Sequence, residues 1–394
     1  MQASCTLLPG KEKRVYQGQT WIFRSDIKKA DKEAQPGDAV RVCAANGAFL
    51  GQAFYNPNSQ ISLRMLTRTE KAVDESFIRE RILRAVEYRK QFADLTSCRL
   101  IFSESDGLPG LVADAFGTVI VIQIMCMGMD RYRNTIVETM NDILHPQAVY
   151  ERSDAPVRHL EGLEETAGLL SGSLPEDIIM QENGIRFRVD VEHGQKTGYF
   201  LDQKENRAAI APFVHNADVL DCFTHTGAFA LHAAHYGAKS VTAVDISDEA
   251  LNTAKANAKL NGFENIDFVC ANAFDWLKAQ TMEDKRYDVV ILDPPAFTKT
   301  RATVDAARRG YKEINLRGMK LVRDGGYLVT CSCSQHMHRD EFVRVINEAA
   351  RDAHVRLMQV ELRTQGRDHP ILPSMPETEY LKCGIYRIEK LQMS

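Results

Sequence analysis

The 394-residue sequence lacks an uninterrupted apolar run of the roughly 18 residues that a membrane-spanning helix needs. Its first residues, MQASCTLLPGKEKRVYQGQ, also lack the apolar core of a signal peptide. Hydrophobic residues make up 44% of the chain and charged residues 26%, as in globular proteins. We therefore expect a cytoplasmic protein with no membrane partner.

Cysteine patterns typical of disulfide frameworks or zinc sites are missing as well. The chain has nine cysteines, an odd number, and contains no C-x-x-C pair. This pattern favours reduced thiols over a disulfide scaffold. Cys331 and Cys333 offer two metal ligands, but no second pair lies nearby in the sequence, and we expect no metal ion.

A strong positive charge is absent too, since the net charge is −4 and the isoelectric point is near 6.3. This argues against indiscriminate binding to nucleic acid. Residues 1–70 nevertheless contain ten Lys and Arg residues against six Asp and Glu residues. The first region of the chain is therefore a candidate for a local basic patch.

The pattern of apolar runs divides the chain into three predicted domains. Residues 1–70 contain short apolar runs separated by turn residues, including Asn46-Gly47, which predict a small β-barrel. Residues 72–180 begin with a helical stretch and continue with strands and a second helix, which predicts an α+β domain. In the first helix, apolar residues recur at helical spacing: Phe77, Ile78, Ile82, Leu83 and Val86.

From residue 186 to 394, five apolar strands alternate with helical segments. Such βα repeats predict a parallel, doubly wound α/β sheet covered on both faces, a Rossmann-like domain. Sheets of this kind place their ligands beyond the carboxyl ends of the strands. The motifs that carry chemistry in this sequence all lie at those ends.

The first of these strands runs into Asp221-Cys-Phe-Thr-His-Thr-Gly-Ala-Phe229, and the second ends at Asp245, 18 residues after Gly227. An acidic residue at this distance from a glycine turn is typical of nucleotide-binding folds, where it binds the ribose. The G-x-G-x-x-G motif that a dinucleotide pyrophosphate requires is absent. The loop therefore favours S-adenosylmethionine (SAM) over NAD, with an unliganded turn as the alternative.

The third and fourth strands lead into two further polar segments. Asn272 and Ala273 follow the third strand and suit adenine binding, although Asn is equally suited to capping a helix. Asp293 follows the fourth strand and precedes two prolines and Phe297. The prolines fix the backbone, so that the Asp293 carboxylate and the Phe297 ring stay at the edge of the sheet. This combination is typical of a site that grips a planar ring.

The fifth strand ends in the sequence YLVTCSCSQ at residues 327–335. A thiol beside a carboxylate and a SAM pocket indicates covalent catalysis. Carbon 5 of cytosine becomes nucleophilic only after a thiolate adds to carbon 6. Methylation of an amino nitrogen, by contrast, needs no thiol.

With the segments LDQKENR, DCFTHTGAF, DPPAF, RRGYKEIN and TCSCS, the chain resembles the bacterial ribosomal RNA large subunit methyltransferase I family over nearly its whole length. The resemblance implies a SAM-dependent cytosine-C5 methyltransferase with an N-terminal PUA domain that acts in rRNA processing. It implies 23S ribosomal RNA or the assembling large subunit as partner. A homodimer is one oligomeric state we consider.

The same resemblance assigns roles to individual residues. In the wider superfamily the nucleophile is the ninth residue from the first glycine of the fifth strand, and counting from Gly325 gives Cys333. Asp293 becomes its partner on the cytosine ring, and Cys331, two residues earlier, is expected on the same side but deeper, in the core. The residues expected at the cofactor are Gln203, Arg207, Asp221, Phe223, Thr224, Thr226, Gly227, Asp245, Ile246, Asn272, Ala273 and Asp293.

Several details stay open at this point. The family's segment at residues 199–203 is expected to close over the cofactor, or else to be a plain linker. A second cysteine that assists product release in many superfamily members is replaced by Ala296, which leaves His225, His336 and His369 as candidate bases. Phe200, Phe229, Trp21 and Phe23 are expected in hydrophobic cores.

Two other functions compete with the cytosine-C5 hypothesis. An RNA methyltransferase acting on an amino group of guanine or adenine needs only the Asp-Pro-Pro-aromatic segment. A PUA-type RNA-binding or assembly factor needs no catalytic residue at all. The intact SAM loop, Asp245, Asp293 and Cys333 disfavour the last alternative.

Overall fold

A computed structural model describes residues 2–298 and 303–391 of the chain. The outermost predicted domain limits, residues 1 and 394, therefore lie outside the described residues. The chain divides into two compact units. One comprises Met1–Met180, Val189–Leu201 and Arg367–Thr378, and the other comprises Gln181–Arg188, Asp202–Gly366 and Glu379–Ser394.

The N-terminal part of the first unit is a six-stranded sheet with the strand order β2-β6-β5-β4-β1-β3. The predicted hairpin at Asn46-Gly47 is confirmed, because β4 and β5 pair antiparallel and Gly47 adopts a φ of 86°. The sequence patterns missed β1, β3 and the short helix α1. The elements are β1 (Ser4–Leu7), α1 (Glu12–Tyr16), β2 (Trp21–Ile22), β3 (Ile27–Ala30), β4 (Ala39–Cys43), β5 (Phe49–Tyr55) and β6 (Leu63–Thr67).

Trp21 does not lie in the core of this sheet, contrary to expectation. Its ring is half-buried, and its indole nitrogen donates a hydrogen bond of 2.8 Å to the Glu104 carboxylate. Phe23 is also only half-buried. The indole N–H needs a polar partner, which explains why this aromatic residue stays at the edge of the apolar cluster.

The second sheet of this unit has the order β11-β10-β9-β8-β7 and carries the helices α2 and α4. The helical stretch predicted at the start of residues 72–180 is confirmed as α2, which the Asp74 side chain caps. Leu83 is a correction, since it is 38% exposed while Ile82 beside it is fully buried. The elements are α2 (Glu75–Lys90), β7 (Ser97–Phe102), β8 (Leu111–Phe116), β9 (Val119–Ile124), α3 (Met127–Asp130), α4 (Arg133–Leu144), β10 (Ala148–Ser153) and β11 (Thr166–Gly172).

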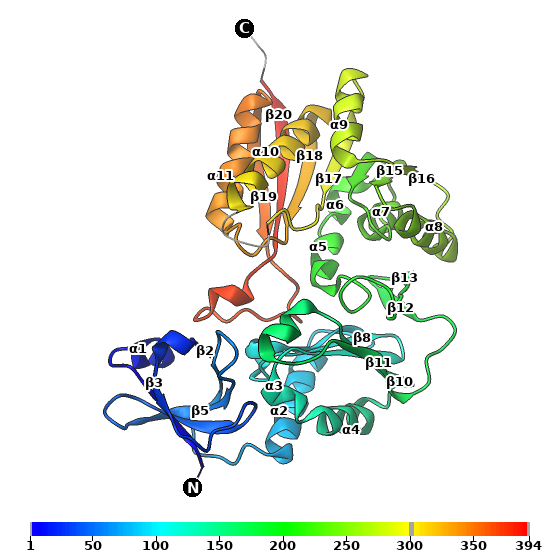
Figure 1. Cartoon of the computed structure of the whole chain (residues 1–394). Coiled ribbons are helices and arrows are strands. Elements are labelled where there is room, and N and C mark those ends of the chain that lie inside the picture. The colour runs from blue at the N-terminus through cyan, green and yellow to red at the C-terminus, as the bar shows by residue number, and fades with distance from the viewer. Residues whose placement is uncertain (1, 299–302, 392–394) are drawn as a thin grey trace. The chain divides into compact units, whose positions relative to one another are not determined.

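The second unit contains a seven-stranded sheet with the order β16-β15-β14-β17-β18-β20-β19 (Figure 1). Its first five strands are parallel, as the βα repeats predict. The elements are β12 (Ile179–Glu182), which begins in the first unit, β13 (Ile185–Arg188), α5 (Lys204–Ala208), α6 (Ala211–Val214), β14 (Asp218–Cys222), α7 (Ala228–His235), β15 (Ser240–Asp245), α8 (Asp248–Asn261), β16 (Ile266–Cys270), α9 (Ala273–Met282), β17 (Tyr287–Leu292), α10 (Val304–Leu321), β18 (Val322–Ser332), α11 (Arg339–Asp352), β19 (Val355–Arg363) and β20 (Lys382–Lys390).

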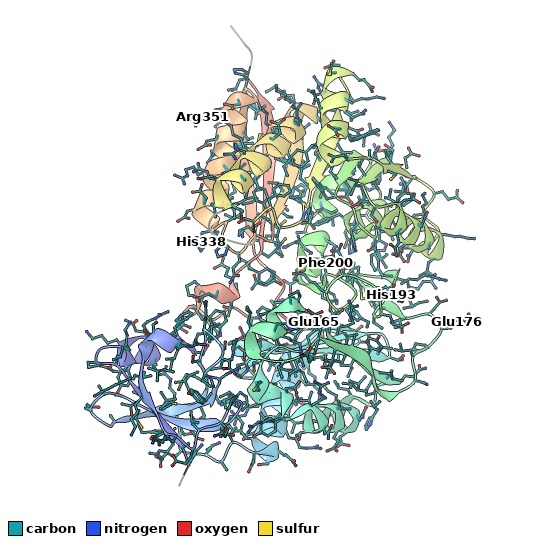
Figure 2. All side chains as sticks on the ribbon, viewed as in Figure 1. Glu165, Glu176, His193, Phe200, His338 and Arg351 are labelled. Carbon is teal, nitrogen blue, oxygen red and sulfur yellow. The ribbon has the colours of Figure 1, made fainter. Side chains whose placement is uncertain are left out.

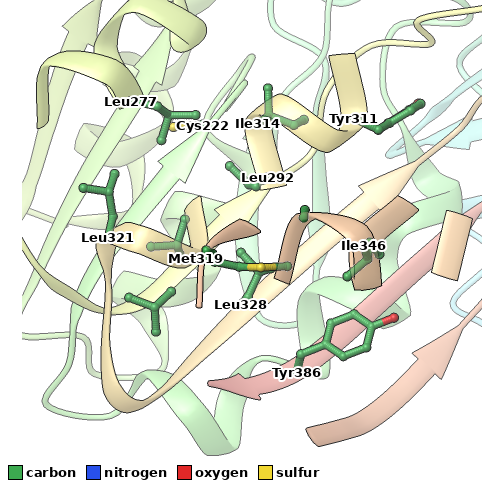
Figure 3. Packing of buried hydrophobic residues seen from close by; sticks show 14 of the residues in the cluster. Cys222, Leu277, Leu292, Tyr311, Ile314, Met319, Leu321, Leu328, Ile346 and Tyr386 are labelled. Carbon is green, nitrogen blue, oxygen red and sulfur yellow. The ribbon is translucent and has the colours of Figure 1, made fainter. Parts of the chain in front are cut away.

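Helices cover both faces of this sheet. One face packs against α9, α10 and α11, and Figure 3 shows Leu292, Leu328 and Tyr386 from the strands with Met319 from α10 in this cluster. The other face packs against α6 and α7 and includes Phe229, which confirms its expected place in the core. Alternate strand residues thus serve opposite layers, as in other doubly wound sheets.

The last two strands depart from the sequence-based expectation. β20, drawn in red in Figure 1, lies between β18 and β19 and runs antiparallel to both. Helix α11 precedes β19, with acidic residues in its first turn and Arg351 in its last turn, where they complement the helix dipole. Figure 2 labels His338 just before this helix and Arg351 near its end.

Among the described residues, no helix is long and apolar enough to cross a membrane.

The neighbours Ile82 and Leu83 provide a matched test of the packing of α2. Replacing the fully buried Ile82 by Ala should lower the free energy of unfolding by about 2–5 kcal/mol, because it removes methyl groups and leaves a cavity. Replacing the partly exposed Leu83 by Ala should change it by only about 0.5 kcal/mol. Urea denaturation followed by circular dichroism measures both. Equal losses for the two variants would contradict the assigned burial.

Candidate active site

The carboxyl ends of four parallel strands bring the predicted site residues to one edge of the sheet. β14 pairs in parallel with β15 and β17, and β17 with β18. Asp221 lies near the end of β14 and Asp245 ends β15, while Asp293 follows β17 and Cys333 follows β18. The fold therefore places three carboxylates and one thiol along a single edge.

The loop after β14 has an unusual backbone. Phe223, His225 and Gly227 have φ values of 66°, 51° and 84°, so every second residue is left-handed. Glycine suits the left-handed backbone at position 227, and a Cβ atom there would also lie 2.6 Å from Leu231 Cδ1 and 3.0 Å from Ala254 Cβ. The backbone N–H of His225 donates a hydrogen bond of 2.8 Å to the Asp245 carboxylate. This bond joins the glycine loop to the acidic end of β15.

Asp221 is fully buried beneath this loop. Burial, together with the nearby charges of Asp293 and Asp245, raises the pKa of its carboxyl to about 7 against the opposing effect of the hydrogen bond from Thr224. Its Oδ2 accepts the Thr224 hydroxyl at 2.5 Å, whereas its buried Oδ1 has no hydrogen-bond partner among the described residues. A buried carboxylate oxygen without a hydrogen-bond partner is suited to a cationic ligand group.

Asp293 is oriented by a chain of buried amides. The Gln203 side chain donates to Asp293 Oδ1 at 3.0 Å, and Asn206 in turn donates to Gln203 Oε1 at 2.7 Å. Asn206 is held by Arg363, which donates to its Oδ1 at 3.0 Å, and by the carbonyl of Thr364. Gln203 and Asn206 are 3% and 1% exposed. Such a network fixes the direction of the Asp293 carboxylate.

The two cysteines of the TCSCS segment have different surroundings. Cys331 is fully buried in the cluster under α6 and α7, as expected for a core residue, and burial next to Cys383 raises its pKa well above the usual value. Cys333 is half-buried, and its Sγ lies 4.0 Å from the carbonyl oxygen of Pro294. β18 ends at Ser332, so strand alternation does not extend to Cys333. Its location beside the Asp-Pro-Pro segment leaves it the more accessible thiol.

Arg207 and Asn272 have structural partners of their own. The Arg207 guanidinium is buried and donates to Glu182 Oε1 at 2.6 Å, and it also lies over the Phe229 ring at 5.9 Å. Asn272 caps α9 by accepting the N–H of Phe274 at 2.9 Å, so the capping role considered from the sequence is confirmed. Neither arrangement tests a cofactor role, which stays a prediction for both.

The remaining predicted cofactor residues lie on the same loops. Ile246 follows β15 and is 69% exposed, which is unusual for an isoleucine and suits contact with a flat apolar ligand. Phe223 begins a row of aromatic rings that continues through Phe274 and Phe297 to Tyr311. Thr226 is half-buried in the glycine loop, and Ala273 is the buried first residue of α9.

The candidate bases have different environments. His225 lies in the glycine loop, where burial lowers its pKa against the attraction of Asp245, so it is not a solvated imidazole. His369 belongs to the first unit and is buried against Asp368 and the Phe102 ring. His336 is half-buried three residues after Cys333.

Phe200, labelled in Figure 2, does not lie in a core, contrary to expectation. It is half-buried, and the Lys196 ammonium lies over its ring at 4.5 Å.

Sequence reasoning missed four residues around this edge. Asn206 and Arg363 support Asp293, while Tyr311 and Lys382 lie around Cys333. Tyr311 belongs to the quoted segment RRGYKEIN, which was a usable signal without an assigned role. Lys382 carried no signal, because its position depends on the antiparallel strand β20 that the patterns did not predict.

Comparisons with known proteins agree with this architecture. Residues 5–68 match the family of PUA-like domains, and residues 127–387 match the family of SAM-dependent methyltransferases. The ribosomal RNA large subunit methyltransferase I of Pseudoalteromonas atlantica is 40% identical over 98% of this chain and 100% of its own length. The protein of the same name from Shewanella denitrificans is 42% identical over 97% of this chain and 98% of its own.

Solved structures share the fold. A SAM-dependent methyltransferase from Streptococcus mutans superposes with a TM-score of 0.83 at 21% identity, covering 98% of this chain and 99% of that one. A methyltransferase complexed with S-adenosylhomocysteine, described as SMU.776, gives 0.84 at the same identity, covering 98% and 99%. At this level of identity the likeness concerns the fold alone.

Fold and site together define a SAM-dependent methyltransferase that carries an N-terminal PUA-like domain. The methyl donor is therefore SAM. The relatives, which span nearly the whole chain, specify the group further: this chain belongs to the ribosomal RNA large subunit methyltransferase I family.

The residues at the sheet edge fit this cofactor. The buried Oδ1 of Asp221 suits the ammonium group of the SAM methionine, and the Asp245 carboxylate suits the ribose hydroxyls. The exposed Ile246 beside Asp245 offers an apolar surface for the adenine. We propose these three contacts, together with the glycine loop, as the cofactor site.

Replacing Asp245 by Ala should weaken SAM binding about tenfold to a hundredfold, because a charge-assisted hydrogen bond is worth about 1.5–3 kcal/mol. Isothermal calorimetry measures the dissociation constant. Asp248, exposed in the first turn of α8, is the matched control, and its replacement by Ala should leave binding unchanged. An unchanged dissociation constant for Asp245→Ala would contradict the assignment.

SAM affinity should rise by about five- to tenfold between pH 6 and pH 7.5. The raised pKa of Asp221, about 7, means that its carboxyl is largely protonated at pH 6. Binding of a cationic group favours the ionised form, so binding should release a proton and become tighter as the pH rises through 7. Calorimetry across this range measures the slope, and Asp221→Asn should flatten it. A slope that survives in this variant would point to another titrating group.

Proposed function

We propose that this protein methylates carbon 5 of a cytosine in 23S ribosomal RNA, free or in the assembling large subunit, through a covalent adduct with Cys333. The adjacency of Cys333 and Asp293 at the ends of the paired strands β18 and β17 carries this proposal. The printed names of the relatives support ribosomal RNA of the large subunit as the substrate class.

The chemistry assigns one task to each side chain. The Cys333 thiolate forms a bond to carbon 6 of the cytosine while the carbon 5–carbon 6 double bond breaks. The displaced electron pair gives carbon 5 nucleophilic character, and a proton shared between Asp293 and ring nitrogen 3 offsets the negative charge. After carbon 5 has accepted the methyl group, it loses its proton to a base, the double bond re-forms and the sulfur leaves as thiolate.

SAM supplies the methyl group when it is bound. The surrounding residues bind and orient the reactants. The amide chain from Arg363 through Asn206 to Gln203 keeps the Asp293 carboxylate in one direction, which favours a productive position of the ring. Phe297, which lies 4.7 Å from the Tyr311 ring, offers an aromatic face near the Asp-Pro-Pro segment.

The PUA-like region gives the protein a second contact with RNA in this proposal. Its excess of Lys and Arg over residues 1–70 would neutralise phosphates without reading sequence. We propose the domain limits 1–70, 72–180 and 186–394, the last holding the chemistry. A homodimer remains a further proposal.

RNA that carries 5-fluorocytosine at the target position should trap a covalent protein–RNA adduct. Fluorine cannot leave carbon 5 as a proton does, so elimination of the sulfur is blocked. Denaturing electrophoresis and mass spectrometry of the crosslinked peptide detect the adduct. Cys333→Ala should abolish it, whereas Cys331→Ala, which alters a core thiol two residues away, should retain it.

The outcomes separate the competing functions. Loss of the adduct with Cys331→Ala but not with Cys333→Ala would mean that the wrong thiol was chosen. No adduct with the unaltered protein on a verified target would exclude the cytosine-C5 mechanism. Full methylation by Cys333→Ser would instead support an amino-group methyltransferase, for which the thiol is a spectator.

A further inference from the structure

A buried lysine, Lys382, lies next to the TCSCS segment on the neighbouring strand. Lys382 begins β20 and pairs with Ser332 at the end of β18. It is 3% exposed, and its Nζ donates hydrogen bonds of 2.8 Å to the carbonyl oxygens of Ser334 and Tyr380. An ammonium group carries three N–H donors. Among the described residues these two carbonyls accept two of them, and Ser334 directly follows Cys333 in the chain.

The charges around Lys382 include that of Cys333. Burial lowers the pKa of Lys382 to about 8, and the negative charge of Cys333 opposes this shift more strongly than that of Glu379. Tyr311 of α10 contacts the serines on either side of Cys333, and burial raises its pKa to about 12, so the phenol is neutral at physiological pH. Among these groups Lys382 is the cation, and it binds the carbonyl of the residue next to Cys333.

We propose that Lys382 is the positioning residue that keeps Cys333 in its thiolate form, ready to attack the cytosine ring. The attraction between two opposite charges is mutual, so the interaction that keeps the ammonium protonated stabilises the thiolate equally. The thiolate is the nucleophilic form of cysteine. This inference rests on the proposed role of Cys333 as the nucleophile.

The neighbouring hydroxyls hold the segment in place for this pairing. The Tyr311 hydroxyl lies 2.9 Å from both Ser332 Oγ and Ser334 Oγ, the residues on either side of Cys333. All three are buried. The lysine binds the carbonyl of Ser334 in the same short stretch, so the residue before Cys333 and the residue after it are both fastened. These hydrogen bonds give the two serines of the TCSCS segment and the tyrosine of RRGYKEIN a structural role beside Cys333.

The pH dependence of Cys333 alkylation tests the proposal on the full chain without RNA. Iodoacetamide reacts with the thiolate, and peptide mass spectrometry follows Cys333 with the exposed Cys270 as an internal reference. Lys382→Met should move the midpoint of the Cys333 profile upward by about one pH unit or more, since an adjacent opposite charge shifts titration by about that much. Lys382→Arg, which keeps the charge, should restore most of the profile.

Lys390 is a matched control in the same strand. It is a second lysine whose pKa burial lowers to about 8, and its Nζ donates to the carbonyls of Met319 and Lys320 instead. Lys390→Met should leave the Cys333 midpoint where it is. If Lys382→Met does not fold, Lys382→Gln, which can still donate to the Ser334 carbonyl, takes its place. An unmoved midpoint with Lys382→Met or Gln, or an equal shift with Lys390→Met, would overturn the inference.

The 5-fluorocytosine experiment distinguishes this failure from failure of the proposed function. A Cys333 adduct in the unaltered protein, together with an unmoved alkylation midpoint in the Lys382 variants, would refute only the role of the lysine. A shifted midpoint without any adduct would refute the cytosine-C5 function while leaving the lysine–thiolate pair intact.

Discussion

The parallel pairing of β14, β15, β17 and β18 is the constraint on which the site depends. Each pair of strands runs in the same direction, so residues separated by more than a hundred positions in the sequence, such as Asp221 and Cys333, meet at one edge. Both faces of the sheet are buried by helices, which leaves the strand ends as the place where polar groups reach a ligand. The topology of the sheet therefore determines where the candidate site lies, and local contacts orient its side chains.

Those local contacts share one physical feature, which is the burial of charge. Asp221, Asp245 and Asp293 gather at the edge, and the mutual repulsion of their charges contributes to the raised pKa of Asp221. Carboxylates held this close favour any cationic group that binds among them. The signs are reversed at Lys382, where burial lowers the pKa of the ammonium group and the negative charge of Cys333 opposes this shift.

The repeating pattern of strands and helices was sufficient to predict the parallel half of the sheet, the glycine loop and the helix α2. Apolar periodicity failed where tertiary context decided the outcome. Leu83 fits the helical spacing of α2 but lies toward solvent, and Trp21 forms a hydrogen bond to a residue 83 positions away. The antiparallel strand β20 also escaped prediction, because nothing local in KCGIYRIEK distinguishes an antiparallel partner of β18 from one more parallel strand.

The same limit explains which candidate site residues the sequence pattern could propose. Asp245, Asp293 and Cys333 stand directly at strand ends, where spacing along the chain translates into position. Lys382 reaches the site only through the pairing of β20 with β18, so its role depends on a register that the sequence does not display. The two thiols of TCSCS differ for a related reason: Cys331 is still inside β18 and packs in the core, whereas Cys333 lies one residue beyond its end. A single step past the last ladder pair therefore separates a fully buried core thiol from a half-buried one beside the Asp-Pro-Pro segment.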